Sequence, residues 1–245
     1  MSTVVAPERA THENGKKARE RDPGVKGMVE VVARIREIGN GILMNPMTEE
    51  TKRNLLHGTP KQVKRDRRPE DIAREKIYRD PKGRTCVPTM NLVAALNHAG
   101  RSVKMGKKTI ATATTTTLFS FAEFPDEFLV FDGLDENGDL PWVVDIRRGV
   151  MASGVKPVAV AIVRPKFPSW SLAVRVHLNE KLVGEDTLRK LFDEAGTNSG
   201  LCDFRPQKKG PFGRFRVVGW RVTPLPDYTE EVSEELTDLP WEEID

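Results

Sequence analysis

Residues 170–222 read WSLAVRVHLNEKLVGEDTLRKLFDEAGTNSGLCDFRPQKKGPFGRFRVVGWRV and predict a strand, a helix and a second strand in succession. From 170 to 178 every second residue is apolar, as in a strand with one buried face. Leu188, Leu191, Phe192 and Ala195 recur at the spacing of an amphipathic helix, and we expect Gly196 to end that helix. Residues 214–222 form the closing strand, so the stretch predicts a compact β-α-β unit.

A second unit of the same kind is predicted from the first part of the chain. Residues 28–38 alternate like a half-buried strand, and residues 90–100 have helical periodicity that ends at a glycine. Residues 109–124 are expected to be extended, and Asn137-Gly138 indicates a hairpin. A strand over 157–163 is expected to end at the segment 164–168. Together these elements predict an α+β, ferredoxin-like or RNA-recognition-like fold, an antiparallel sheet with helices on one face and hairpin additions.

The charges are unevenly distributed along the 245 residues. Residues 1–27 are polar and aperiodic, which predicts a disordered N-terminal arm. Residues 227–245 hold nine acids and no base, which predicts an acidic disordered tail, so that a single domain spans 28–226. Within this domain, residues 52–108 carry sixteen Lys and Arg against five Asp and Glu, and 61–84 form a basic insertion with a helix starting at Pro69. Such clusters of positive charge favour a polyanion such as nucleic acid as the partner.

Candidate nucleic-acid-binding residues follow from these segments. We expect Arg175 and His177 to point from the sheet into a groove, opposite Trp170 and Val174, with the loop 196–216 and the basic block 61–108 beside them. Glycines in the loop would let its backbone approach a phosphate, and its Phe rings could stack on bases. The predicted glycines are Gly196, Gly200, Gly210 and Gly213. The predicted side chains are Arg65, Arg67, Arg68, Lys104, Lys107, Lys108, Arg164, Lys166, Arg175, His177, Arg205, Lys208, Lys209, Phe212, Arg214 and Arg216.

An amphipathic helix ending in AG, followed by the loop GLCDFRP…GPFGRFRV and a strand, resembles the C-terminal half of the repeat-associated mysterious protein (RAMP) superfamily. These are RNA-recognition-fold proteins of CRISPR effector complexes, in particular the backbone subunits, and phage-encoded relatives are similar. The resemblance is best over 158–222. It implies a ferredoxin-like core that holds a single strand through its backbone, and head-to-tail self-association along that strand. It also implies that residues 196–213 are the family's glycine-rich loop and 61–84 its variable finger-like region. The chain is shorter than the backbone subunits and carries an acidic tail unlike theirs.

The tail ends in EELTDLPWEEID, which resembles the partner-recruiting tails of single-strand-binding proteins. Leu239, Trp241 and Ile244 would then contact a protein partner, whereas the nine acids could instead occupy the basic groove. A merely solubilising tail is the alternative.

Catalytic motifs are absent from the sequence. The four histidines have no metal-ligand spacing, no phosphate-binding loop of the GxxxxGK[ST] kind occurs, and no cofactor or metal is expected. Acids for a metal-dependent nuclease would have to come from Asp132, Asp145 or Asp203. The two cysteines are far apart, and the sequence has neither a secretory signal nor an apolar run of about 18 residues. We therefore expect the protein in the cytoplasm of a bacterial or phage-infected cell, away from membranes.

Three functions are compatible with these patterns. The first is non-catalytic, largely sequence-independent binding of single-stranded DNA or RNA, as a head-to-tail homo-oligomer. The second is a nuclease or RNA-processing enzyme of the same superfamily. The third is a phage structural or adaptor protein. The residues that would distinguish DNA from RNA cannot be identified in the sequence.

Overall fold

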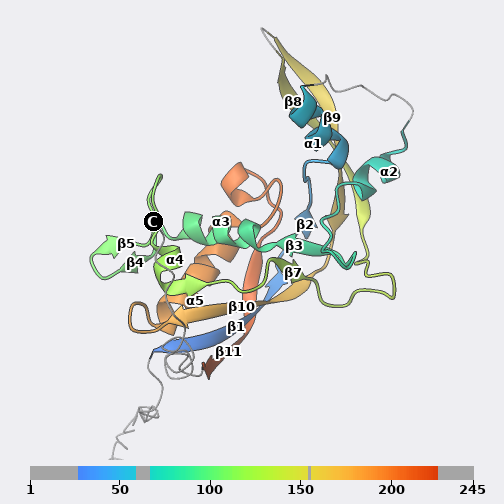
Figure 1. Ribbon diagram of the computed structural model, residues 1–245. Coiled ribbons are helices and arrows are strands. Elements are labelled where there is room, and N and C mark those ends of the chain that lie inside the picture. Colours follow the sequence, from blue (N-terminus) through green and yellow to red (C-terminus); the bar gives the residue numbers. More distant parts are fainter. Residues whose placement is uncertain (1–26, 59–66, 154–155, 226–245) are drawn as a thin grey trace, which may run out of the picture.

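The computed structural model describes residues 27–58, 67–153 and 156–225 (Figure 1). The N-terminal arm, part of the basic insertion and the acidic tail predicted above lie outside these ranges. Within them, no helix combines the length and the apolar character that crossing a membrane requires.

A four-stranded antiparallel sheet forms the centre of the fold. It contains β1 (Met28–Glu37), β6 (Ala122–Glu123), β10 (Ser171–Asn179) and β11 (Phe215–Pro224), in the order β11-β1-β10-β6. In chain order this is a 4-1-3-2 arrangement. Helix α3 (Thr89–Ala99) connects the first two of these strands and α5 (Glu185–Glu194) connects the last two, and both helices lie on the same side of the sheet (Figure 1). The predicted α+β, ferredoxin-like fold with helices on one face is confirmed.

The core fills the space between the sheet and these two helices. On β1 the alternate residues Val31, Ala33 and Ile35 are fully buried, and on β10 Leu172, Val174, Val176 and Leu178 are as well. The helices contribute Leu92, Leu96, Leu188, Leu191 and Phe192. Burying each Leu or Phe contributes roughly 1.5–3 kcal/mol. One face of each central strand is therefore committed to the core, and the opposite face is left for solvent or a ligand.

A long hairpin projects from the body (Figure 1). It consists of β8 (Val143–Ser153) and β9 (Lys156–Phe167), which pair along their whole length, and its base pairs with β2 (Ile42–Leu43). The short helix α2 (Pro69–Arg74) packs on β9, and Lys76 Nζ donates to the Val163 carbonyl at 2.7 Å. Helix α1 (Glu49–His57) buries none of its residues.

The expectation that β9 ends at 164–168 is wrong, because Pro165 costs this strand no hydrogen bond to β8. The Pro165 carbonyl accepts from Met44 N at 3.2 Å, on the side of β2. The N–H and C=O of a strand residue point to the same edge, so the missing donor of Pro165 also faces away from β8. The strand therefore continues to Phe167.

The expected hairpin at Asn137-Gly138 is also wrong. Gly138 adopts φ +78° in a turn and donates to the Asp135 carbonyl, but the flanking strands separate. Strand β7 (Phe128–Val130) pairs with β3 (Cys86–Pro88), and β8 pairs with β9 instead. The local turn chemistry is right, but each flanking strand has a partner elsewhere.

Residues 109–124 are not extended as expected. They contain α4 (Leu118–Phe121) and the two residues of β6, while β4 (Lys104–Met105) and β5 (Lys108–Thr109) form a small hairpin before them. The Thr112 hydroxyl accepts from the backbone N–H groups of Thr114 and Thr115, which bends the chain. Threonine side chains thus favour a turn over the strand that their propensity suggests.

Gly196 does not end α5. A π-helical turn (Ala195–Ser199) continues the helix, and the turn ends at Gly200, which adopts φ +71°. A Cβ at Gly196 would lie 2.2 Å from the Phe215 carbonyl oxygen, so this glycine allows the helix end to contact the start of β11. The loop then forms a 3-10 turn (Pro206–Lys208) before it enters β11.

Candidate nucleic-acid interface

The open face of the sheet is the side away from α3 and α5. Residues directly opposite one another on antiparallel neighbours point to the same side. From one end, the rows across β11, β1 and β10 on this face are Arg216-Arg36-Ser171, Gly219-Arg34-Ala173 and Arg221-Val32-Arg175. The five arginines in these rows are all exposed. Three strands therefore contribute guanidinium groups to one surface.

A β-bulge in β11 brings two of these arginines to the same side. The register between β11 and β1 shifts at Arg34/Ile35, so that Val218 is an extra residue in its strand. In a regular strand Arg216 and Arg221 would point to opposite sides, because their separation is an odd number of residues. The bulge reverses the alternation between them. Arg34, Arg36 and Arg221 were not predicted as site residues, and the alternation of 28–38 was the signal available for the first two.

The arginines of the open face differ in their partners. Arg34 forms an ion pair with Asp132 at 3.0 Å, and Arg175 donates two hydrogen bonds to Asp126. The hydrogen bond from Arg175 holds the pKa of Asp126 below its ordinary value, so this pair remains charged at neutral pH. These two guanidinium groups are therefore largely satisfied within the protein.

Arg36 and Arg216 are neighbours in the same row, and no described carboxylate forms an ion pair with either one or with Arg221. Like charges directly opposite one another destabilise a sheet. An anion placed between them would remove this repulsion and accept hydrogen bonds from both. This end of the open face is therefore suited to bind a phosphate.

The other end of the open face is more acidic. His177 lies between Glu30 and Glu123, with nitrogen–oxygen distances of 3.8 and 3.6 Å. Arg175 and His177 do lie on the side opposite the buried Val174, as the alternation predicts. The charge thus falls from the Arg36–Arg216 row toward the His177 row, which favours an anionic strand crossing at the first of these.

Aromatic residues are missing from the described positions of the open face on β1, β10 and β11. Between the charged residues lie Val32, Ala173 and Gly219. RNA-recognition domains that read sequence stack bases on aromatic rings at such positions. The chemistry available here is contact with phosphates, which carries no sequence information.

The four loop glycines predicted to approach a phosphate are instead required by the loop's own packing. Added Cβ atoms at Gly210 and Gly213 would lie 1.9 Å and 2.0 Å from backbone carbonyl oxygens of Phe204 and Leu201. The N–H groups of Gly200, Gly210 and Gly213 already donate within the protein, to Ala195, Arg205 and Gly41. These three N–H groups are not available to a ligand.

Arg164 and Phe212 are buried, which corrects their prediction as contact residues. The Arg164 side chain is 5% exposed and pairs with Asp203 at 2.8 Å and Asp145 at 3.5 Å. Phe212 is 2% exposed, beneath the cationic groups of Arg147 and Lys166. This cluster joins the base of the β8–β9 hairpin to the loop 196–216. Neither side chain is therefore exposed to a ligand.

Arg205, Lys208 and Lys209 of the loop lie apart from the open face (Figure 1). The loop packs on α3 and β2, on the helix side of the sheet, where His98 contacts Ser199 and Asp203 N donates to the Leu43 carbonyl. Lys208 and Lys209 are exposed there, whereas Lys166, Arg205 and Arg214 are half-buried. The exposed Arg216 of the loop does lie in a row of the open face. The single groove predicted from the sequence is therefore not formed.

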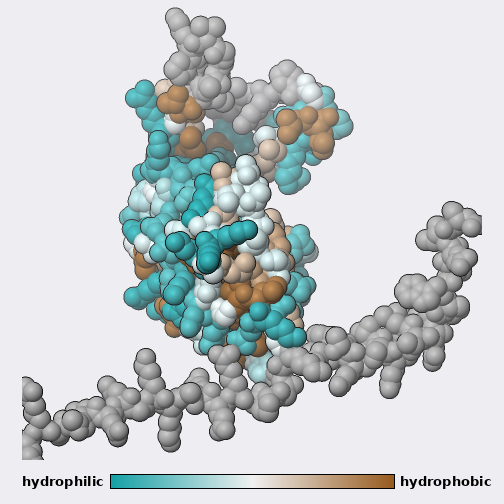
Figure 2. All heavy atoms as spheres, turned by 90° about the vertical axis from the view of Figure 1, so that its left-hand side faces the viewer, coloured by the Kyte–Doolittle hydropathy of each residue, from teal (hydrophilic) through white to brown (hydrophobic). Residues whose placement is uncertain are grey.

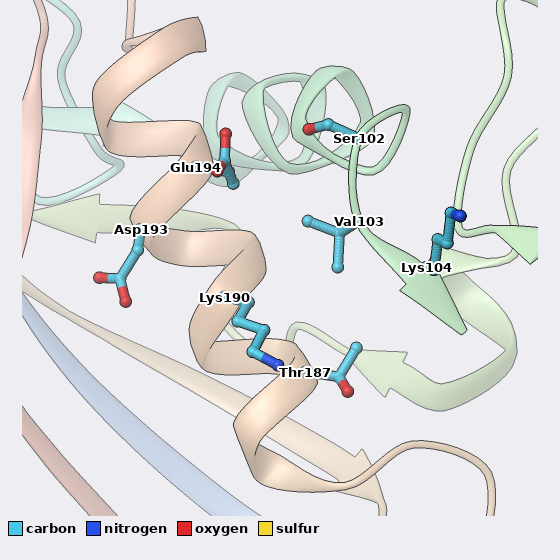
Figure 3. A pocket seen from close by; sticks show the side chains of 7 residues that line it. All are labelled: Ser102, Val103, Lys104, Thr187, Lys190, Asp193 and Glu194. Atoms are coloured by element: carbon cyan, nitrogen blue, oxygen red, sulfur yellow. The ribbon is translucent and has the colours of Figure 1, made fainter. Parts of the chain in front are cut away.

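Lys104, Lys107 and Lys108 lie on the small β4–β5 hairpin beyond the end of α3, and all three are exposed. Lys104 lines a hollow of about 390 Å³ with Lys190, Asp193 and Glu194 (Figure 3). In that view Lys104 and Lys190 come from opposite walls, β4 and α5. The hollow combines both signs of charge, so it is a weak candidate for an anion.

In the described part of the basic insertion, the two arginines predicted to contact nucleic acid have local acidic partners. Arg67 forms an ion pair with Glu75 and Arg68 with Asp71, at the start of α2. Arg65 and the tail residues Leu239, Trp241 and Ile244 lie outside the described residues. The roles predicted for these residues stay predictions.

The three acids considered for a nuclease, Asp132, Asp145 and Asp203, all form ion pairs or hydrogen bonds within the protein. Asp145 and Asp203 contact Arg164, and Asp132 accepts from Arg34 and the Ser171 hydroxyl. Among the residues that the structure describes, no three or more His, Cys, Asp or Glu side chains form a group that could hold a metal ion.

Comparison with known proteins finds a likeness among solved structures. No family model and no curated protein sequence matches the chain. Among solved structures, a chain of "Cryo-EM structure of the Type III-B Cmr-beta bound to cognate target RNA" matches with a TM-score of 0.47 and 13% sequence identity. The match covers 81% of this chain and 61% of the other, so this chain spans less than two thirds of the length of that protein.

Proposed function

We propose that the chain binds single-stranded nucleic acid on the open face of its sheet, with little sequence preference and without cleaving it. The observation that carries this proposal is the row in which Arg36 and Arg216 lie side by side with no described acidic partner. Arg221 adds a third exposed guanidinium on the same face. The lack of aromatic residues at the described positions of this face supports contact with phosphates over base reading.

The test is a binding titration of labelled single-stranded DNA and RNA at several salt concentrations. Each phosphate contact contributes about −0.7 to the slope of log K against log [salt] for single strands. The protein should give a slope of about −2 if Arg36, Arg216 and Arg221 each bind one phosphate. A triple Arg→Ala variant should lose most of this slope, while Lys82→Ala, in an exposed loop, should keep it.

Two outcomes would contradict the proposal. A salt-independent affinity, or a triple variant that binds like the parent protein, would mean that the open face is not the interface. Shortening of the labelled strand on a gel, with or without Mg²⁺, would show that the protein is an enzyme. Stable assembly with a protein and no affinity for any strand would favour the adaptor function.

We also propose that copies of the chain assemble head to tail along the strand. An apolar hollow of about 440 Å³ lies at the sheet edge formed by β6, where Met90 and Phe119 are 64% and 58% exposed. The acids Glu123 and Glu127 line it as well. Figure 2, which faces the side of the molecule that carries α4 and the β4–β5 hairpin, shows a hydrophobic patch low on the body and smaller ones elsewhere.

The β8–β9 hairpin exposes apolar and basic side chains, which complement the apolar and acidic lining of this hollow. Ile146 and Val150 are 55% and 67% exposed, and Arg148, exposed between them, points to the same side of the strand as both. Two different, complementary patches on one chain make a heterologous contact, which propagates instead of closing into a dimer. The hairpin of one copy would therefore occupy the hollow of the next.

Sedimentation with and without an oligonucleotide tests this assembly. Val150→Glu and Phe119→Glu should each leave a monomer, because each places a charge in the contact. A mixture of these two variants should form a dimer and nothing longer, since one intact hairpin and one intact hollow remain. Unchanged assembly in both variants would contradict the proposed contact.

A further inference from the structure

A polar hollow of about 310 Å³ lies on the helix side of the sheet, away from the open face. Its walls are the C-terminal half of α3, the threonine-rich segment 111–116 and the loop 196–216. The residues that line it include Asn97, His98, Arg101 and Gln207, and none of its lining residues is acidic. The hollow in Figure 3 differs in this respect, because Asp193 and Glu194 line that one.

Hydrogen bonds inside the protein orient both amides of the hollow as donors. Gln207 Oε1 accepts from Arg205 Nε and Nη2 at 3.1 and 3.0 Å. A guanidinium can only donate, so the oxygen of Gln207 must face it. Asn97 Oδ1 accepts from the Thr116 hydroxyl at 2.6 Å. With both oxygens occupied, the NH₂ groups of Gln207 and Asn97 remain as donors without a described acceptor.

Positive potential adds to these donors. Arg101 is exposed at the end of α3, and no described carboxylate forms an ion pair with it. Burial, together with the charges of Arg101 and Arg205, lowers the pKa of His98, so this imidazole is neutral at pH 7. His98 Nδ1 lies 2.8 Å from the buried Ser199 hydroxyl, which fixes the ring and leaves Nε2 as its other polar atom. The exposed Thr114 hydroxyl is a further group that can donate to an anion.

We infer that this hollow binds a phosphate group, held by the Arg101 guanidinium and the NH₂ groups of Asn97 and Gln207. Aromatic residues are not among those that line it, so it offers no surface on which to stack a base. The phosphate can come from an internal phosphodiester or from the end of a strand. The inference deepens the proposed function, since it gives a bound strand a second anchor on the opposite side of the sheet.

The first experiment uses inorganic phosphate and the NMR signals of His98 in the full chain. Phosphate should shift the imidazole signals of His98 in the parent protein. Arg101→Ala and Asn97→Asp should abolish the shift, since the first removes a charge and the second replaces a donor with a carboxylate of the same size. Lys82→Ala also lowers the net charge by one and should leave the shift intact. An unchanged shift in both hollow variants, or no shift in the parent protein, would overturn the inference.

The second experiment compares hexathymidylate with and without a 5′-phosphate. If the hollow takes a terminal phosphate, the phosphorylated strand binds about tenfold more tightly and Arg101→Ala removes the difference. If it takes an internal phosphodiester, both strands bind alike, and Arg101→Ala weakens both and reduces the salt slope by about 0.7. No effect of Arg101→Ala on either strand would contradict the inference.

These results are separable from a failure of the proposed function. Arg216→Ala on the open face should weaken strand binding and still leave the phosphate-induced shift of His98. If open-face variants bind strands normally while the Arg101 variant does not, the inference stands and the proposed interface is wrong.

Discussion

Replacing Arg216 by Ala should stabilise the fold and weaken binding of a nucleic acid strand at the same time. Arg216 lies opposite Arg36 on adjacent strands, with no described acid paired to either. Two unit charges roughly 6 Å apart in a water-like medium repel by about 0.7 kcal/mol. Removing one of them should raise the free energy of unfolding by up to this amount, or the melting temperature by about 1–3 °C. The lost phosphate contact should weaken strand binding about five- to tenfold.

The assay is thermal denaturation without ligand, followed by a strand titration at several salt concentrations. The double variant Arg36→Ala/Arg216→Ala completes a thermodynamic cycle, since the stabilising effects of the two single changes should not add. The stabilisation should also shrink in high salt, because exposed charges are screened. A lower melting temperature for Arg216→Ala, together with an unchanged salt slope of binding, would refute the reasoning that this row is an anion site.

Other predictions concern the loop, the buried ion pairs and the thiols. Gly213→Ala should cost at least about 3 kcal/mol in chemical denaturation, because φ is +71° and the new Cβ would lie 2.0 Å from a carbonyl oxygen. Gly133→Ala, with φ +73° and open space around it, should cost only about 1 kcal/mol, and equal losses would contradict this account. Arg164→Ala removes the cation shared by Asp145 and Asp203, but Asp145 keeps Arg147 and Asp203 is 34% exposed, so the change should destabilise by about 1–3 kcal/mol, and a gain in stability in the same assay would show that the pairs contribute nothing. Burial raises the pKa of Cys86 and Cys202 to about 12, so neither thiol should react with a disulfide reagent at pH 8 until the protein is unfolded; rapid labelling of the native protein would disprove this.

The elements with strong periodicity could be predicted, because their period reports directly which side is buried. β1, α3, β10, α5 and β11 lie within a few residues of their expected positions. The pairing of strands could not be predicted with the same success. Asn137-Gly138 does form a turn, but β7 pairs with β3, a segment about 40 residues earlier. Local turn chemistry does not encode a partner that only tertiary packing selects.

The candidate site could be predicted only in part, for two physical reasons. The sequence does not show whether a side chain is buried or already paired. Arg164 and Phe212 were therefore predicted as contact residues, although Arg164 is buried in an ion pair and Phe212 is buried. A bulge in β11 reverses the alternation, so Arg221 could not be assigned to the open face from the pattern of its strand. The four loop glycines were predicted to allow close approach of a phosphate, but the atoms that come close to each of them belong to the protein.

The position of β1 has a consequence for the order in which the protein is made. This strand lies between β10 and β11, which both come much later in the chain, and about 130 residues separate its end from the start of β10. At a synthesis rate of roughly 5–20 residues per second, both edges of β1 wait unpaired for about 7–26 s. The apolar side chains of this strand are exposed throughout that interval. The nascent chain is therefore most vulnerable to aggregation before β10 emerges, and a chaperone that acts during translation would have its main task there.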